Sequence, residues 1–137
     1  MINTEKSVKF PEVFSILIVE DNQVNMKLTK ILIGNHFPKA IIYEAFSGQD
    51  AVAIFKETTL DIILMDIQMP VMSGYDTAKA IRAIEVERGG RVPIIALTAS
   101  VLQDEMPSCI DAGMDAFLNK PIDKQAMFSL LNEWLAI

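Results

Sequence analysis

The sequence predicts a single α/β domain in which helices cover both faces of a parallel sheet. The chain has 137 residues, close to the usual size of one domain. Hydrophobic residues make up 51% of the chain and charged residues 22%, a globular composition that excludes disorder for most of its length. Short apolar runs alternate with segments of helical periodicity, which is typical of open α/β sheets.

Five apolar runs predict the strands. Each run is short, carries few polar residues and is apolar on both faces, as expected of parallel strands buried between two layers of helices. We expect the domain to span residues 15–137, with residues 1–14 as an N-terminal tail. The predicted strands are Ile16–Val19, Ile41–Tyr43, Ile62–Met65, Pro93–Leu97 and Ala116–Leu118.

Five segments with helical spacing predict the helices that follow the strands. Ser47 and Asp123 are predicted N-caps, because their side-chain oxygens can accept free backbone N–H groups. Gly89 with Gly90, and Gly113, are predicted to end the third and fourth helices. The segments are Val24-Leu28-Ile31-Leu32, Ala51-Ile54-Phe55, Ala78-Ile81-Ile84, Gln103–Ala112 and Ala126-Met127-Leu130-Leu131-Trp134.

Charge and composition narrow the range of functions. Twelve basic and 18 acidic residues give a net charge of −6, with no Lys/Arg cluster, so we expect no direct nucleic-acid binding. The single cysteine, Cys109, excludes an internal disulfide and a cysteine-based zinc site. No apolar run approaches the ~20 residues of a membrane span. No secretory signal is visible, and we expect a cytoplasmic location without a membrane partner.

Polar side chains gather where the predicted strands end. Glu20 and Asp21 follow the first strand, Asp66 the third, Thr98 the fourth and Lys120 the fifth. The carboxyl ends of parallel strands form the functional edge of such sheets. Two carboxylates about 4 Å apart repel by roughly 4 kcal/mol at an effective dielectric constant near 20, so three of them require a counter-ion. Mg²⁺ suits oxygen ligands and leaves room for a phosphoryl group, which Asp66 could accept as a nucleophile.

The same segments resemble the receiver domain of two-component response regulators, and most of all the receivers of hybrid histidine kinases. The likeness covers about residues 15–137, and four motifs in order make it specific. They are Ile16–Asn22, Asp61–Pro70 with Gly74, Ala96–Ala99 and Asn119–Pro121.

This resemblance implies a flavodoxin-like (βα)5 three-layer sandwich with strand order 2-1-3-4-5. It implies a phosphorelay function, in which Asp66 receives a phosphoryl group from a phosphohistidine. The donor would be a histidine kinase or a histidine phosphotransfer protein, and the chain could itself be part of a larger hybrid kinase. The implied Mg²⁺ ligands are Glu20, Asp21, Asp66 and the backbone carbonyl of Gln68.

The resemblance also implies a switch and a minimal catalytic role. Thr98 and Lys120 would contact the phosphoryl oxygens, and the domain would catalyse only its own phosphorylation and dephosphorylation. Phe117 stands where many members have Tyr, so a switch there would rest on packing with Thr98. Phosphorylation would change the surface of the fourth helix, fifth strand and fifth helix. The Lys120–Pro121 peptide is expected to be cis.

Three other functions compete with this interpretation. A flavin or nucleotide binder would need a Gly-rich or hydroxyl-rich phosphate loop after the first strand, where this chain has two acids. A phosphatase with an Asp nucleophile usually has a second acid two residues later, where this chain has Gln68. A module that binds a partner without phosphorylation would not need the full set of acids with Thr98 and Lys120. The cognate kinase, target, signal, phosphorylation lifetime and oligomeric state cannot be predicted.

Overall fold

Five strands form one parallel sheet, so their carboxyl ends lie at a single edge. The computed structural model describes residues 13–99 and 105–135. The strand order is β2-β1-β3-β4-β5 and every neighbouring pair is parallel, which confirms the predicted order. The strands are β1 (Ser15–Val19), β2 (Ile41–Ala45), β3 (Ile62–Asp66), β4 (Ile94–Thr98) and β5 (Ala116–Asn119).

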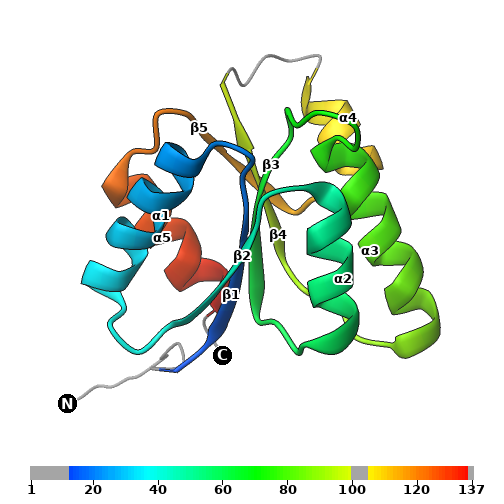
Figure 1. Cartoon of the computed structure of the whole chain (residues 1–137), viewed down its shortest axis with the longest axis horizontal. Helices are drawn as coiled ribbons and strands as arrows, with labels where there is room; N and C mark the ends of the chain where they lie inside the picture. Colours follow the sequence, from blue (N-terminus) through cyan, green and yellow to red (C-terminus); the bar gives the residue numbers. More distant parts are fainter. Residues whose placement is uncertain (1–12, 100–104, 136–137) are drawn as a thin grey trace.

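Helices cover both faces of this sheet and complete three layers (Figure 1). From β1 the chain first adds β2 on one side, and it then crosses back to add β3, β4 and β5 on the other side of β1. Right-handed crossovers therefore place α1 on one face and α2, α3 and α4 on the other, while α5 joins α1. The helices are α1 (Gln23–His36), α2 (Gly48–Glu57), α3 (Gly74–Arg88), α4 (Glu105–Asp111) and α5 (Lys124–Leu135).

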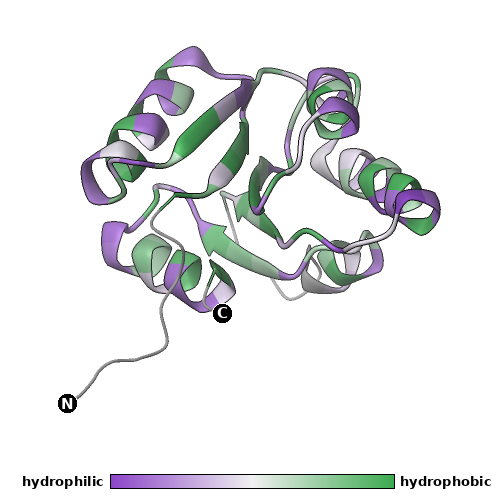
Figure 2. Ribbon diagram, turned by 90° about the horizontal axis from the view of Figure 1, so that it is seen from below, coloured by the Kyte–Doolittle hydropathy of each residue, from purple (hydrophilic) through white to green (hydrophobic). Residues whose placement is uncertain are grey.

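The core lies on both sides of the strands. Successive strand residues point to opposite faces. Leu17 and Ile63 therefore pack toward α2 and α3, whereas Ile16 and Leu64 pack toward α1 and α5, and all four are fully buried. In Figure 2 the strands are apolar and the outer faces of the helices are hydrophilic. Burial on both faces explains why the strands appear in the sequence as continuous apolar runs rather than alternating ones.

Both predicted N-caps are confirmed. The Ser47 hydroxyl accepts the backbone N–H of Asp50 at 3.1 Å at the start of α2. The Asp123 carboxylate accepts the N–H of Ala126 at 2.9 Å at the start of α5. Each cap satisfies a backbone donor that the first turn of a helix leaves without an intrahelical partner.

The glycine stops of the third and fourth helices are also confirmed. Gly89 caps α3 with φ +89°, and Gly113 follows α4 with φ +94°, a backbone region that glycine adopts without steric cost. The described part of the fourth helix is Glu105–Asp111. Its predicted start at Gln103 lies outside the described residues.

Of the four residues in the apolar stripe that predicted α1, only Leu32 packs against the core. Val24, Leu28 and Ile31 are 66%, 55% and 50% exposed. The helix instead buries Met26 and Ile33, which lie on its opposite side. Helical spacing therefore identified the helix but not its packing face. We call Val24, Leu28 and Ile31 the α1 ridge.

An ion-pair network lies at the amino edge of the sheet, opposite the candidate site. The Arg82 guanidinium of α3 donates to Glu85 at 2.7 Å and to Asp115 at 2.8 Å. It also donates to the carbonyls of Val92 at 2.8 Å and Gly113 at 2.9 Å. All three charged side chains are at most 14% exposed, so this network joins α3 to the segments that enter β4 and β5.

The chain ahead of β1 is described only from residue 13. Phe14 is 1% exposed and its ring lies 5.3 Å, centroid to centroid, from that of Phe37. The predicted domain boundary at residue 15 stays a prediction, because most of the predicted tail lies outside the described residues. Within the described ranges, every helix is too short or too polar to cross a membrane.

Candidate functional site

The candidate site is formed where three strands end at the carboxyl edge. Asp66 is the last residue of β3, Glu20 directly follows β1, and Lys120 directly follows β5. Backbone hydrogen bonds extend the sheet past the strand ends and hold these residues in place. Glu20 N–H donates to Ala45 O at 3.0 Å, and Lys120 N–H donates to Thr98 O at 2.7 Å. The sheet itself therefore positions all three side chains.

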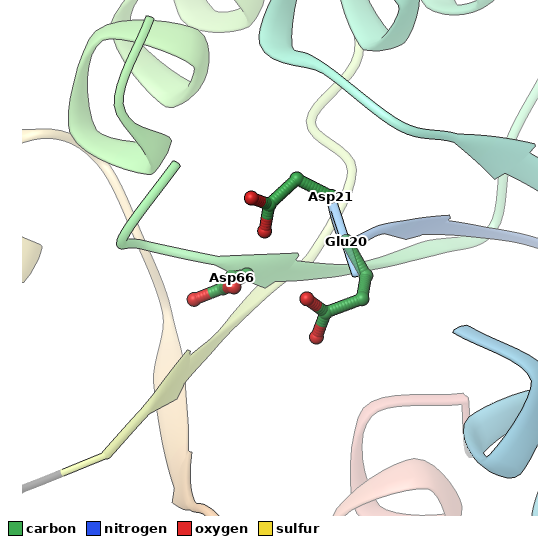
Figure 3. A group of neighbouring side chains, drawn as sticks. All are labelled: Glu20, Asp21 and Asp66. Atoms are coloured by element: carbon green, nitrogen blue, oxygen red, sulfur yellow. The ribbon is translucent and has the colours of Figure 1, made fainter. Parts of the chain in front are cut away.

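Three carboxylates converge on one space at this edge (Figure 3). Glu20, Asp21 and Asp66 each place one oxygen so that these atoms all lie within 4.8 Å of one another. Glu20 and Asp66 are buried, with 2% and 4% of their surface exposed, whereas Asp21 is exposed. The predicted cluster of acids is thus assembled, and solvent reaches it from the side of Asp21.

Lys120 bridges two of these carboxylates. Its Nζ lies 3.0 Å from Glu20 Oε1 and 3.0 Å from Asp66 Oδ2. The ammonium group is thus already in contact with the predicted phosphoacceptor. The pair with Glu20 was not predicted, because spacing along the chain says nothing about which of two nearby acids a lysine reaches.

Burial and charge act against each other in this group. Burial raises the pKa of Glu20, although the hydrogen bond from Lys120 and the N–H of Asn22 act to lower it. Burial alone would lower the pKa of Lys120, but its hydrogen bonds with Glu20 and Asp66 and their negative charges together raise it. Lys120 therefore stays charged at neutral pH, and Glu20 is the carboxyl group on which burial favours the protonated form.

The donor set fits a hard divalent cation. Three carboxylates and one ammonium group carry a formal charge of −2. Their oxygens are the ligands that Mg²⁺ prefers, and the exposed Asp21 leaves a path for ion and water. One Lys charge does not neutralise the cluster, so a bound divalent cation would relieve the remaining repulsion.

The other predicted residues lie around this cluster. Gln68 donates its backbone N–H to Asp66 Oδ1 at 3.0 Å, while ligation of a metal by its carbonyl stays a prediction. Thr98 ends β4 and is 3% exposed. Phe117 lies in β5, paired in register with Ala96, and is partly buried. The Lys120–Pro121 peptide is cis, as expected.

One feature of the loop after Asp66 was missed. Val71 has a φ of +70°, a conformation that β-branched residues rarely adopt. Nothing in the segment from Met69 to Met72 signals it, because Pro followed by a β-branched residue predicts extended backbone or an ordinary turn.

Residues 16–132 match the family model described as the response regulator receiver domain. The chain belongs to this family. A receiver domain is a signalling phosphoacceptor of two-component phosphorelays, which agrees with the residues gathered at the carboxyl edge.

Similar proteins are much longer than this receiver domain. It is 36% identical over 122 residues to hybrid signal transduction histidine kinase I of Dictyostelium discoideum, covering 85% of this chain and 7% of that protein. It is 35% identical over 123 residues to the sensor protein GacS of Pseudomonas syringae pv. syringae, covering 89% of this chain and 13% of that protein. The chain thus spans only a small part of the relatives that it matches.

Solved structures of other receiver domains superpose closely. A co-crystal of the Saccharomyces cerevisiae histidine phosphotransfer protein Ypd1 with the receiver domain of its response regulator Ssk1 matches with a TM-score of 0.85 and 36% identity, covering 92% of this chain and 90% of that chain. The receiver domain of sensor histidine kinase PA1611 from Pseudomonas aeruginosa has a magnesium ion in its active-site cleft. It matches with a TM-score of 0.79 and 37% identity, covering 89% of this chain and 97% of that chain.

Proposed function

We propose that Asp66 is the phosphoacceptor of this receiver domain and takes a phosphoryl group from a phosphohistidine with the help of Mg²⁺. The observation that supports this most directly is the contact of Lys120 with both Asp66 and Glu20, at 3.0 Å each, inside a cluster of three carboxylates. Such a group serves no packing purpose, since burying like charges destabilises a fold. It is suited to a ligand that brings both a divalent cation and a phosphoryl group.

The carboxylate of Asp66 is held ready for attack. The Gln68 N–H orients Oδ1 and the Lys120 ammonium orients Oδ2, each at 3.0 Å. A carboxylate oxygen of Asp66 attacks the phosphorus, forming an O–P bond. The P–N bond of the donor breaks, and its electron pair stays on the imidazole nitrogen. The reaction is mainly one of positioning and charge stabilisation, so these few groups suffice.

The remaining charges are provided by residues at the same edge. Glu20, Asp21 and Asp66, with the Gln68 carbonyl, would hold Mg²⁺, which supplies positive charge against the phosphoryl oxygens. A phosphoryl group adds a charge of about −1.5 to −2, and Lys120 offsets part of it. The Thr98 hydroxyl donates a hydrogen bond to a phosphoryl oxygen.

Phosphorylation then changes a surface away from Asp66. As Thr98 moves toward the phosphoryl group, the half-buried Phe117 turns into the space beside it, since their strands β4 and β5 are neighbours. Phe117 has no hydroxyl, so packing alone carries this movement. The surface of α4, β5 and α5 is the one that a downstream partner would distinguish, because it contains the moving side chain.

We propose that the donor is a protein, either a histidine kinase or a histidine phosphotransfer protein. The α1 ridge exposes three apolar side chains beside the site. A groove of about 530 Å³ runs between α1 and the loop from Lys120 to Ile122, with Leu28 and Pro121 in its walls. The groove is also lined by Glu20 and Lys120 of the site. An apolar surface of this kind beside the site suits a protein rather than a small metabolite.

The length of the related proteins bears on the setting of this domain. Its relatives carry the matched region as a small part of a histidine kinase, so we propose that this receiver serves a cytoplasmic phosphorelay, alone or within a hybrid kinase. It would turn over only its own phosphoryl group and have no separate substrate.

Mass spectrometry of the intact protein tests this function. After incubation with acetyl phosphate and Mg²⁺, the wild type should gain one base-labile phosphoryl group. The Asp66→Asn variant, and the wild type without Mg²⁺, should gain none. If neither acetyl phosphate nor a panel of phosphorylated histidine donors labels the wild type, the domain is instead a binding module that works without phosphorylation.

A further inference from the structure

The strand β2 forms one margin of the sheet, and two of its residues direct backbone groups away from the sheet. Among the described residues, β2 pairs with β1 and with no other strand, in an unbroken register of five residues. The N–H of Ile41 and the carbonyl of Ala45 bond to the residues that flank β1, at 2.8 Å and 3.0 Å. Because peptide groups alternate in direction along a strand, Ile42 and Glu44 point their N–H and C=O groups outward. Figure 1 shows this margin between α1 and α2.

This margin lacks the features that usually keep an edge strand from pairing with another chain. Natural edge strands are protected by lysine, proline, bulges or unpaired charges. The sequence of β2, Ile-Ile-Tyr-Glu-Ala, has neither lysine nor proline, and its β-branched and aromatic residues favour strand pairing. Its single charge, on Glu44, is paired with Lys30 Nζ at 2.6 Å. Ile41 in β2 and Phe46 just after it are 46% and 40% exposed. The margin is therefore open to another strand.

The outward backbone groups are arranged so that a second copy of β2 can satisfy all of them. In an antiparallel pair, opposite residues alternate between pairs that exchange two hydrogen bonds and pairs that exchange none. A two-fold axis at Tyr43 sets Ile42 of each copy opposite Glu44 of the other. Both of these pairs exchange two hydrogen bonds, so every outward N–H and C=O group of β2 finds a partner. A contact of this kind is self-complementary and closes as a dimer.

The side chains of β2 suit the same register. Tyr43 lies opposite Tyr43 of the second copy, in a pair without hydrogen bonds, where side chains come closest and aromatic pairs are favourable. The exposed Ile41 lies opposite Ala45 of the second copy. No like charges stand directly opposite each other, because Glu44 faces Ile42. The register therefore adds apolar and aromatic contacts without a cost in charge.

We propose that β2 is an interaction surface on which a second copy of this chain adds its own β2 antiparallel, joining two five-stranded sheets into one. This dimer goes beyond the proposed phosphoacceptor function and does not depend on it. The carboxyl edges of the two sheets point in opposite directions, and β5 lies at the far margin of each sheet. Phosphotransfer and dimerisation can therefore take place on the same domain.

Sedimentation equilibrium of the full chain tests the association. An interface built on one strand pair is small, so the average mass should rise from one chain toward two between about 1 μM and 1 mM. Tyr43→Lys sets two lysines opposite each other and removes the aromatic pair, and it should weaken dimerisation about tenfold. Val86→Lys is the matched control, because Val86 is 85% exposed on α3, and it should leave the Kd unchanged. The inference is overturned if wild type stays monomeric up to about 1 mM, or if the two variants have equal effects.

Disulfide cross-linking tests the register. Tyr43→Cys brings two thiols together at the two-fold axis, where Cα atoms about 4.5 Å apart are within the span of a disulfide. Oxidised glutathione should convert this variant into a covalent dimer. Ile41→Cys is the matched control, because it lies on the same face of β2 but about 14 Å along the strand from its counterpart, and it should stay uncoupled. Wild type, whose single thiol at Cys109 is 4% exposed, gives the background. Equal cross-linking of the two variants, or none at position 43, overturns the inference.

Discussion

Gly74, the first residue of α3, offers a sharp test of how the fold positions Asp66. A Cβ atom at Gly74 would lie 2.5 Å from the carbonyl oxygen of Asp66 and 2.5 Å from the Cα of Ile67. These distances are about 1 Å shorter than ordinary van der Waals contact. Both neighbours are backbone atoms, so no side chain can rotate away. Gly74→Ala must therefore move the start of α3 or the end of β3.

The expected effect is large for so small a change. Overpacking of this kind costs about 1–3 kcal/mol, and a domain of this size loses roughly 4 °C in Tm per kcal/mol. The displaced segment carries Asp66, whose carboxylate must keep its contacts with Glu20 and Lys120. Since a misplacement of about 1 Å can cost 100-fold in rate, phosphorylation by acetyl phosphate should slow by about 10-fold to 100-fold.

Gly34 provides the matched control. It lies within α1, where a Cβ added at this position meets no atom within 4 Å apart from the neighbouring backbone of the helix itself. Gly34→Ala therefore only replaces glycine by a better helix former. This variant should gain about 0.5–1 kcal/mol of stability and keep the wild-type phosphorylation rate. Urea unfolding and intact-mass kinetics measure both properties. The reasoning is refuted if the two variants shift stability in the same direction, or if Gly74→Ala phosphorylates at the wild-type rate.

Three further outcomes follow from the charges of the structure. Arg82→Met removes the guanidinium partner of the buried Glu85 and should lower the free energy of unfolding in urea by about 3–5 kcal/mol. Lys30→Met breaks an exposed ion pair and should lower it by at most about 1 kcal/mol. Equal losses would contradict the burial argument. Because burial raises the pKa of Glu20 above its ordinary value of 4.5, the folded state holds a proton that the unfolded chain releases. The metal-free wild type should thus lose stability relative to Glu20→Gln as pH rises from about 4.5 to the raised pKa, and a constant difference between pH 4 and 7 would exclude this. Mg²⁺ at about 100 times its Kd should add roughly 2.7 kcal/mol to the free energy of unfolding of the wild type. In thermal unfolding, Asp21→Asn should gain less stability than the wild type at the same Mg²⁺ concentration. No gain for the wild type would exclude the metal site.

The composition of the site was predictable because each of its residues is placed by a strand. Once the apolar runs are recognised as parallel strands, the residues after them must share one edge, which brings Glu20 and Asp66 together although 46 positions separate them. The strand order itself came from the resemblance to receiver domains, since alternation alone permits several orders of the same five strands.

The sequence by itself determined the elements of this protein, their caps and the chemistry at the ends of its strands, because periodicity, capping and strand ends are local properties. Tertiary structure alone decided three other features. The packing face of α1 is one, because the helix carries apolar residues on two sides and only the sheet selects Met26 and Ile33. The bridge from Lys120 to Glu20 and the outward turn at Val71 are the others. Each depends on how separate segments meet in space, and spacing along a chain does not contain that information.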